Sequence, residues 1–141
     1  MYKMLQPAHS GVAYLALIFL VIVVINAFVG LSSKKEFTDK DYKLGLIGLI
    51  FSHIQLLLGL ILYFVSPLVQ NFGVAMKDST LRLYALEHPL INIIAIALIT
   101  IGWSKHKKAT ESNKKFKMFA VFYTIGLVLI LSRIPWKVWF A

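Results

Sequence analysis

The 141-residue sequence contains no cysteine and only six acidic residues, and each shortage narrows what the protein can be. Without cysteine the chain has no disulfide, no Cys-ligated zinc, no iron–sulfur cluster, no covalent c-type haem attachment and no palmitoylation site. The sequence also lacks a Walker loop, a dinucleotide-binding fingerprint, a His-Glu-x-x-His pair and a nucleophile elbow. The sequence therefore gives no support to a stand-alone enzyme of these classes.

Apolar residues are abundant instead, and they make up 59% of the chain. A disordered protein does not reach this apolar content. Fifteen lysines and arginines give a net charge of +9. These basic residues stand between long apolar blocks and do not follow a soluble face. The pattern indicates an integral membrane protein whose loops carry the charge, and not a nucleic-acid-binding domain.

Four apolar blocks are each long enough to cross a bilayer, which needs about 20 helical residues. They cover residues 11–31, 44–65, 83–103 and 116–134. Four such continuous segments do not suit a transmembrane barrel, and isolated strands leave backbone groups unpaired in lipid. We therefore predict an all-α polytopic membrane protein, with residues 1–141 forming one four-transmembrane-helix bundle. The first block is too long for the apolar core of a cleaved signal peptide.

Lysine and arginine are distributed unequally between the two ends of the predicted bundle. Ten lysines follow the first and third spans: Lys34, Lys35, Lys40, Lys43, Lys105, Lys107, Lys108, Lys114, Lys115 and Lys117. Five basic residues belong to the other end: Lys3, Lys77, Arg82, Arg133 and Lys137. The positive-inside rule then places both lysine-rich loops in the cytoplasm and both termini outside. Aromatic residues at span ends are expected at the lipid headgroups: Tyr2, Trp103, Trp136, Trp139 and Phe140.

Polar residues inside the spans need an explanation, because each is costly in lipid unless it is paired or functional. The sequence places these within or beside the four spans: His9, Asn26, Ser52, His53, Gln55, Glu87, His88, Asn92, Thr124 and Arg133. Glu87 is expected to pair with Arg82 or Arg133. His88 and Asn92 share a helix face at a spacing of four residues. His106 lies in a lysine-rich stretch and is expected to be solvated.

A stripe of small residues follows one side of the second span: Gly45, Gly48, Ser52 and Gly59. Such a stripe lets a neighbouring helix approach closely, and it also leaves room for a flat ligand. We favour helix packing for these glycines.

Three histidines, His9, His53 and His88, belong to three different predicted helices. Facing helices of a bundle commonly build a cofactor site by each projecting a ligand inward. Imidazoles without thiols suit haem iron, or less specifically copper or zinc. We prefer haem b with two axial imidazoles, first His53 with His88 and second His9 with His88. A bare metal held by His9, Glu87 and His88, or histidines that only hydrogen-bond between helices, are the alternatives.

Several segments carry a family resemblance that covers nearly the whole chain: AHSGVAYLAL, SHIQLLLGLILYFVSP, LRLYALEHPLINIIAIALITIG and KKFKMFAVFYTIGLVLILSRIPW. Together they resemble a family of small bacterial four-helix membrane proteins labelled cytochrome b. The most specific pieces are His-x-Gln-Leu and Tyr-Phe-x-Ser-Pro in the second span and Glu-His-Pro in the third. The resemblance implies haem as the cofactor, His9, His53 and His88 as the functional histidines, and a bacterial inner membrane with periplasmic termini. The four-helix haem-binding halves of haem A synthases are a fainter likeness.

Three functions remain open on these grounds. The first is a b-type haem protein that passes single electrons, with Asn92 near the cofactor and with Arg82 and Arg133 available to haem propionates or a quinone. The second is a cofactor-free accessory subunit of a larger membrane complex or homo-oligomer. The third, ranked last, is a transporter or channel, because four helices without an internal repeat need an oligomer to form a pore.

Overall fold

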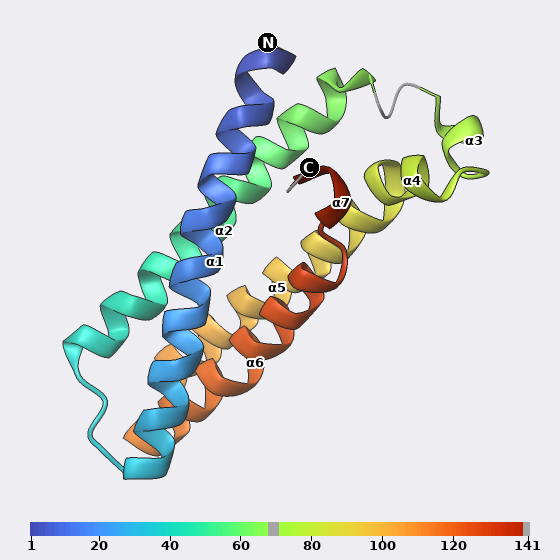
Figure 1. Ribbon diagram of the computed structural model, residues 1–141. Helices are drawn as coiled ribbons and strands as arrows, with labels where there is room; N and C mark the ends of the chain where they lie inside the picture. Colours follow the sequence, from blue (N-terminus) through green and yellow to red (C-terminus); the bar gives the residue numbers. More distant parts are fainter. Residues whose placement is uncertain (68–70, 140–141) are drawn as a thin grey trace.

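The computed structural model describes residues 1–67 and 71–139, and helices dominate this part of the chain (Figure 1). In chain order they are α1 (Tyr2–Ser33), α2 (Asp39–Val65), α3 (Phe72–Ala75), α4 (Ser79–Arg82), a π-helix (Leu83–Glu87), α5 (His88–Lys108), α6 (Ser112–Ser132) and α7 (Trp136–Trp139). In the described part, four rods are long and apolar enough to span a membrane: α1, α2, the continuous segment Ser79–Lys108, and α6. The predicted all-α bundle of four membrane helices is confirmed.

The helices extend beyond the apolar runs because polar residues cap them. Helix α1 ends where Lys34 adopts the left-handed conformation with φ at 54°, and the Lys34 N–H donates to the Leu31 carbonyl. Helix α2 begins at a capping box, in which the Thr38 and Asp41 side chains each accept from the other's backbone N–H. It ends before Ser66 and Pro67, where proline disfavours further helix.

Asp41 also connects α2 to α1. Its carboxylate is fully buried and accepts from Asn26 Nδ2 at 2.7 Å and from Lys35 Nζ at 3.2 Å. The backbone N–H and hydroxyl of Thr38 donate to its other oxygen at 2.9 and 3.0 Å. This carboxylate explains why the first span carries Asn26, since a buried polar side chain needs a hydrogen-bonding partner.

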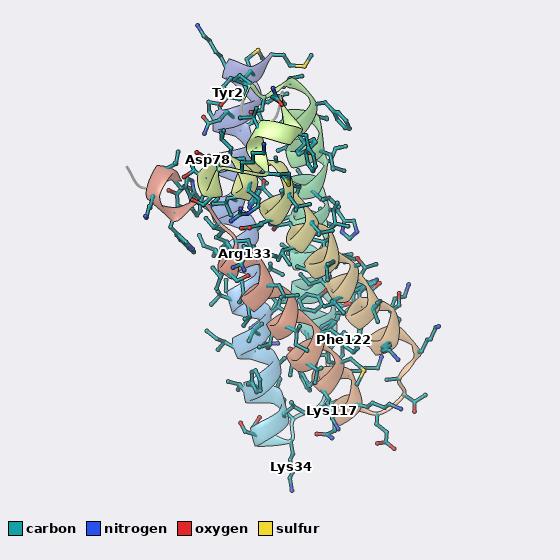
Figure 2. All side chains as sticks on the ribbon, turned by 90° about the vertical axis from the view of Figure 1, so that its right-hand side faces the viewer. Tyr2, Lys34, Asp78, Lys117, Phe122 and Arg133 are labelled. Atoms are coloured by element: carbon teal, nitrogen blue, oxygen red, sulfur yellow. The ribbon has the colours of Figure 1, made fainter. Side chains whose placement is uncertain are left out.

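The four long helices form two antiparallel pairs. Helix α1 packs on α2 and α6, and α5 packs on α6, whereas α2 and α5 are in looser contact (Figure 1). The α1–α2 and α5–α6 loops lie together at one end, which we call the basic end. The N-terminus and the α2–α4 connection lie at the opposite end, which we call the pocket end. Figure 2 shows Lys34 and Lys117 at the basic end and Tyr2 at the pocket end.

The tightly packed core occupies the half of the bundle next to the basic end. It consists of Leu20, Val23, Ala27, Ile99, Trp103, Phe116, Phe119, Ala120, Tyr123 and Leu127. Small residues let these side chains approach the backbone, as Gly45 does for Phe119. The Tyr123 hydroxyl donates to the Gly45 carbonyl oxygen at 2.8 Å. The small residues Gly45, Gly48 and Ser52 are therefore buried inside the bundle, as the packing interpretation of the stripe predicts.

The expectation that His106 is solvated is wrong, because α5 continues to Lys108 and turns this residue inward. His106 is fully buried, with its ring centroid 4.4 Å from that of Phe119 and 4.6 Å from that of Trp103. Its Nδ1 lies 2.6 Å from the Trp103 carbonyl oxygen. Trp103 is itself buried inside the bundle. Phe140, also predicted at a span end, lies outside the described residues.

Candidate functional site

A pocket of about 310 Å³ lies at the pocket end, between α1, α2 and α5 and beneath the segment that follows α6. This volume falls at the lower end of the range for small-molecule sites. Polar side chains gather in its largely apolar wall: Gln6, His9, Gln55, Tyr63, His88 and Asn92. The site exists because the large core side chains stop at mid-bundle, while residues such as Ala13, Ala16 and Gly59 leave space beyond them.

Two imidazoles, His9 of α1 and His88 of α5, approach each other in this pocket. Their ring centroids are 6.2 Å apart and the ring planes are nearly perpendicular, at 86°. A metal bound by two imidazole nitrogens at about 2 Å each requires ring centres about 6 Å apart, once about 1 Å from each nitrogen to its ring centre is included. The separation therefore suits two ligands of one metal atom.

Hydrogen bonds fix the orientation and tautomer of His88. Its Nδ1 lies 2.8 Å from the Arg133 carbonyl oxygen, so this nitrogen carries the proton and donates. Asn92 Nδ2 donates to the His88 carbonyl oxygen at 2.6 Å and lies 3.3 Å from His88 Nδ1. The Nε2 atom is left with a free lone pair. This arrangement matches metal-binding histidines, which donate their other N–H to a carbonyl or carboxylate.

The π-helix immediately before His88 sets the position of that residue. A π-turn holds one more residue per turn than an α-turn and frequently occurs at functional sites. Pro89 has no N–H to donate to the Ala85 carbonyl four residues earlier. The Tyr63 hydroxyl of α2 donates to this carbonyl instead, at 2.8 Å. This hydrogen bond connects the π-helix before α5 to α2 beside the pocket.

His9 is positioned by a hydrogen bond to its backbone carbonyl, and its ring packs against Gly59. Gln55 Nε2 donates to the His9 carbonyl oxygen at 2.8 Å. A Cβ atom at Gly59 would lie 3.0 Å from Cε1 of the His9 ring. Within the described residues, His9 Nδ1, Gln55 Oε1 and the Tyr84 hydroxyl are buried around this pocket without a hydrogen-bond partner. Buried polar atoms are rarely left unsatisfied, so their concentration here indicates a place for a ligand or ordered water.

Glu87 and two arginines form an ionic cluster beside the pocket. Arg82 Nε lies 3.0 Å from one carboxylate oxygen of Glu87, and Arg133 Nε lies 3.8 Å from the other. The expected pairing is confirmed, and Glu87 uses both arginines. Neither arginine is among the described residues that line the pocket wall, although the Arg133 carbonyl contacts His88. Glu87 therefore faces its arginines and does not complete a metal cluster with His9 and His88.

His53 lies outside the pocket. Its side chain is exposed on α2, with Nδ1 2.9 Å from the Leu49 carbonyl oxygen and Nε2 3.3 Å from Thr100 Oγ1. These contacts place the ring at the α2–α5 boundary. The structure therefore brings together the second of the two predicted pairs, His9 with His88, and separates His53 from it. Asn92, predicted beside the cofactor, does line the pocket.

Three further aromatic residues line the pocket although no sequence pattern identifies them as site residues: Tyr63, Tyr84 and Trp139. The chain after α6 turns back over the pocket, and Trp139 Nε1 donates to the Ser10 hydroxyl of α1. Tyr2 also lines the pocket, while Trp136 is exposed. The Arg-Ile-Pro sequence at residues 133–135 was the available signal, because proline ends a helix and permits such a turn.

Within residues 1–67 and 71–139, no three histidine, aspartate or glutamate side chains gather as a metal-binding group. The His9–His88 pair is the arrangement that the pocket offers to a metal-containing ligand. Comparison of the chain with protein-family models, with curated proteins and with solved structures finds no match.

Proposed function

We propose that this chain is a membrane-embedded b-type haem protein that transfers single electrons, in which His9 and His88 would hold the haem iron. The observation that carries the proposal is the approach of the two imidazole rings, whose centroids are 6.2 Å apart, in a largely apolar pocket. A bound haem would supply a one-electron iron couple whose potential depends on the axial ligands and the surrounding dielectric. No bare-metal site is needed to account for these residues.

The residues around the pair support this role. Arg133 and Asn92 hold His88 with its Nε2 free to bind, and Gly59 makes room for the His9 ring. The apolar wall excludes water from a bound cofactor. The ionic cluster of Arg82, Glu87 and Arg133 stands next to this wall and offers positive charge to propionates that extend from it.

Location and partners belong to the same proposal. We infer from the distribution of lysines that the basic end lies in the cytoplasm and the pocket end on the opposite side of the membrane. The resemblance to small bacterial membrane proteins implies that this membrane is a bacterial inner membrane, so that the pocket end faces the periplasm. The electron donor would then be a quinol or a larger membrane complex that reaches the pocket end. The small-residue stripe gives no support to the second candidate, a cofactor-free subunit, because its residues pack against side chains of this same chain.

Reduced-minus-oxidised spectra of the purified protein, with haem added where the expression host supplies too little, test the proposal. The parent protein should show a b-type α band. His9→Ala and His88→Ala should each weaken or abolish it, whereas His53→Ala should retain it. The last variant is a matched control, because it removes a histidine outside the pocket. A parent protein without the band, or a band that survives the loss of both His9 and His88, would rule out the proposed axial pair.

A further inference from the structure

A second site lies at the opposite end of the bundle, in a cleft between the end of α5 and the start of α6. The cleft has a volume of about 280 Å³ and is lined by Lys105, Lys108, Ala109, Lys114 and Met118. We call these five residues the lysine cleft. Three lysines beside one small cleft concentrate positive charge there, and an anion bound between them would reduce their mutual repulsion.

The three cleft lysines have no ion-pair partner in the described part of the chain. Elsewhere, Lys35 and Lys43 do pair with carboxylates, Asp41 and Asp39. The single carboxylate in the α5–α6 connection, Glu111, is not part of the cleft lining. The cleft therefore presents uncompensated positive charge, which suits the phosphate of a ligand.

Exposed apolar side chains continue from the cleft along both helices, away from the basic end. On α5, Ile101 and Ile94 follow Lys105 at intervals that keep one helix face, and both side chains are exposed. On α6, exposed Val121 and Ile125 continue the face of Lys114. Hydrocarbon chains could lie along these two faces while the head of the same molecule remains at the lysines.

We propose that the lysine cleft binds the phosphate of an anionic phospholipid whose acyl chains lie along the adjoining faces of α5 and α6. Basic pockets between membrane helices are suited to acidic lipid headgroups, and each lysine near such a headgroup strengthens the attraction. The site is independent of the His9–His88 pocket. Only some lysines of the basic end line the cleft. A lipid-binding role of these lysines can therefore be distinguished from the effect that all the lysines have on membrane orientation.

The chain offers a matched control for charge. Lys107 and Lys117 belong to the same basic end but are not cleft residues. The double variants Lys105→Gln/Lys114→Gln and Lys107→Gln/Lys117→Gln therefore remove the same charge from inside and outside the cleft. Lys115 is unsuitable as a control, because its Nζ lies 5.4 Å from the ring centre of Phe37.

The binding of phosphatidylglycerol and phosphatidylcholine to the delipidated full chain in mild detergent can be measured by native mass spectrometry, with inorganic phosphate as a third probe. We expect phosphatidylglycerol to bind preferentially, the outer pair of substitutions to leave its affinity nearly unchanged, and the cleft pair to lower it about thirty-fold. Equal weakening by both pairs would show a diffuse charge effect and overturn the proposal. Inorganic phosphate that binds as tightly as the lipid would identify a soluble anion as the ligand. If the parent protein binds the two lipids equally well, the proposed site for an anionic phospholipid is wrong.

Discussion

Gly59 and His9 are matched across the α1–α2 interface, since a Cβ atom at Gly59 would stand only 3.0 Å from Cε1 of the histidine ring. Such a contact is tighter than ordinary van der Waals packing, so Gly59→Ala should displace the ring from its position opposite His88. Because axial ligation depends on that position, we expect weaker haem binding and a changed α band. Haem titration of the purified variant, followed by its reduced-minus-oxidised spectrum, measures both effects.

Gly11→Ala is the control for this substitution. Gly11 is exposed two residues after His9, and a Cβ atom there meets nothing within 4 Å. The control should bind haem as the parent protein does. If Gly59→Ala also binds haem with unchanged affinity and spectrum, the His9 ring does not need the space above Gly59 and its assignment as a ligand is wrong.

Gly126→Ala should lower stability without involving the pocket. A Cβ atom at this position would lie 2.5 Å from Ile99 Cγ1 and 3.0 Å from the Ala95 carbonyl oxygen. The backbone oxygen cannot rotate away, so α5 and α6 must separate slightly, and overpacking of this kind costs about 1–3 kcal/mol. Unfolding of the detergent-solubilised protein by sodium dodecyl sulfate, followed by circular dichroism, gives the change. An unfolding midpoint equal to that of Gly11→Ala would contradict the close α5–α6 contact.

Asp41→Ala should destabilise the basic end. The substitution leaves the donors of Asn26, Lys35 and Thr38 without their shared acceptor. An unmade hydrogen bond to a buried group costs about 1–3 kcal/mol. Asp39→Ala provides the comparison, because Asp39 forms an exposed pair with Lys43 and exposed pairs add little to stability. The same unfolding measurement should give a lower midpoint for Asp41→Ala than for Asp39→Ala, and equal midpoints would contradict the role of the buried carboxylate.

Block length and charge placement were sufficient to predict four membrane helices, because both follow directly from bilayer thickness and the cost of burying charge. Helix ends are harder to predict from apolar runs alone, because the Thr38–Asp41 capping box that begins α2 lies outside the apolar run. The small-residue stripe of α2 marks a buried face, but the sequence does not show that His53, next to Ser52, points away from the pocket and lies exposed against Thr100 of α5.

The sequence also does not reveal the π-helix at Leu83–Glu87. It adds one residue to the turn just before His88, so the helix faces before and after it are offset from those of an ideal α-helix. His106 was misplaced for a related reason. The aromatic rings around it come from segments far apart in the sequence and include Phe37, Tyr42, Trp103 and Phe119. Long-range packing of this kind overrides the local abundance of lysine.

The topology can be tested directly because the chain contains no cysteine, so that a single introduced thiol reports its own side of the membrane. Thr110 lies exposed in the α5–α6 connection at the basic end, and Val74 is exposed in α3 at the pocket end. In intact cells whose outer membrane has been made permeable, a membrane-impermeant maleimide should label Val74→Cys but label Thr110→Cys only after the inner membrane is lysed. If only Thr110→Cys is labelled in intact cells, the orientation is the opposite of the one proposed. It would also place the His9–His88 pocket on the cytoplasmic side, where a different set of electron donors would reach it.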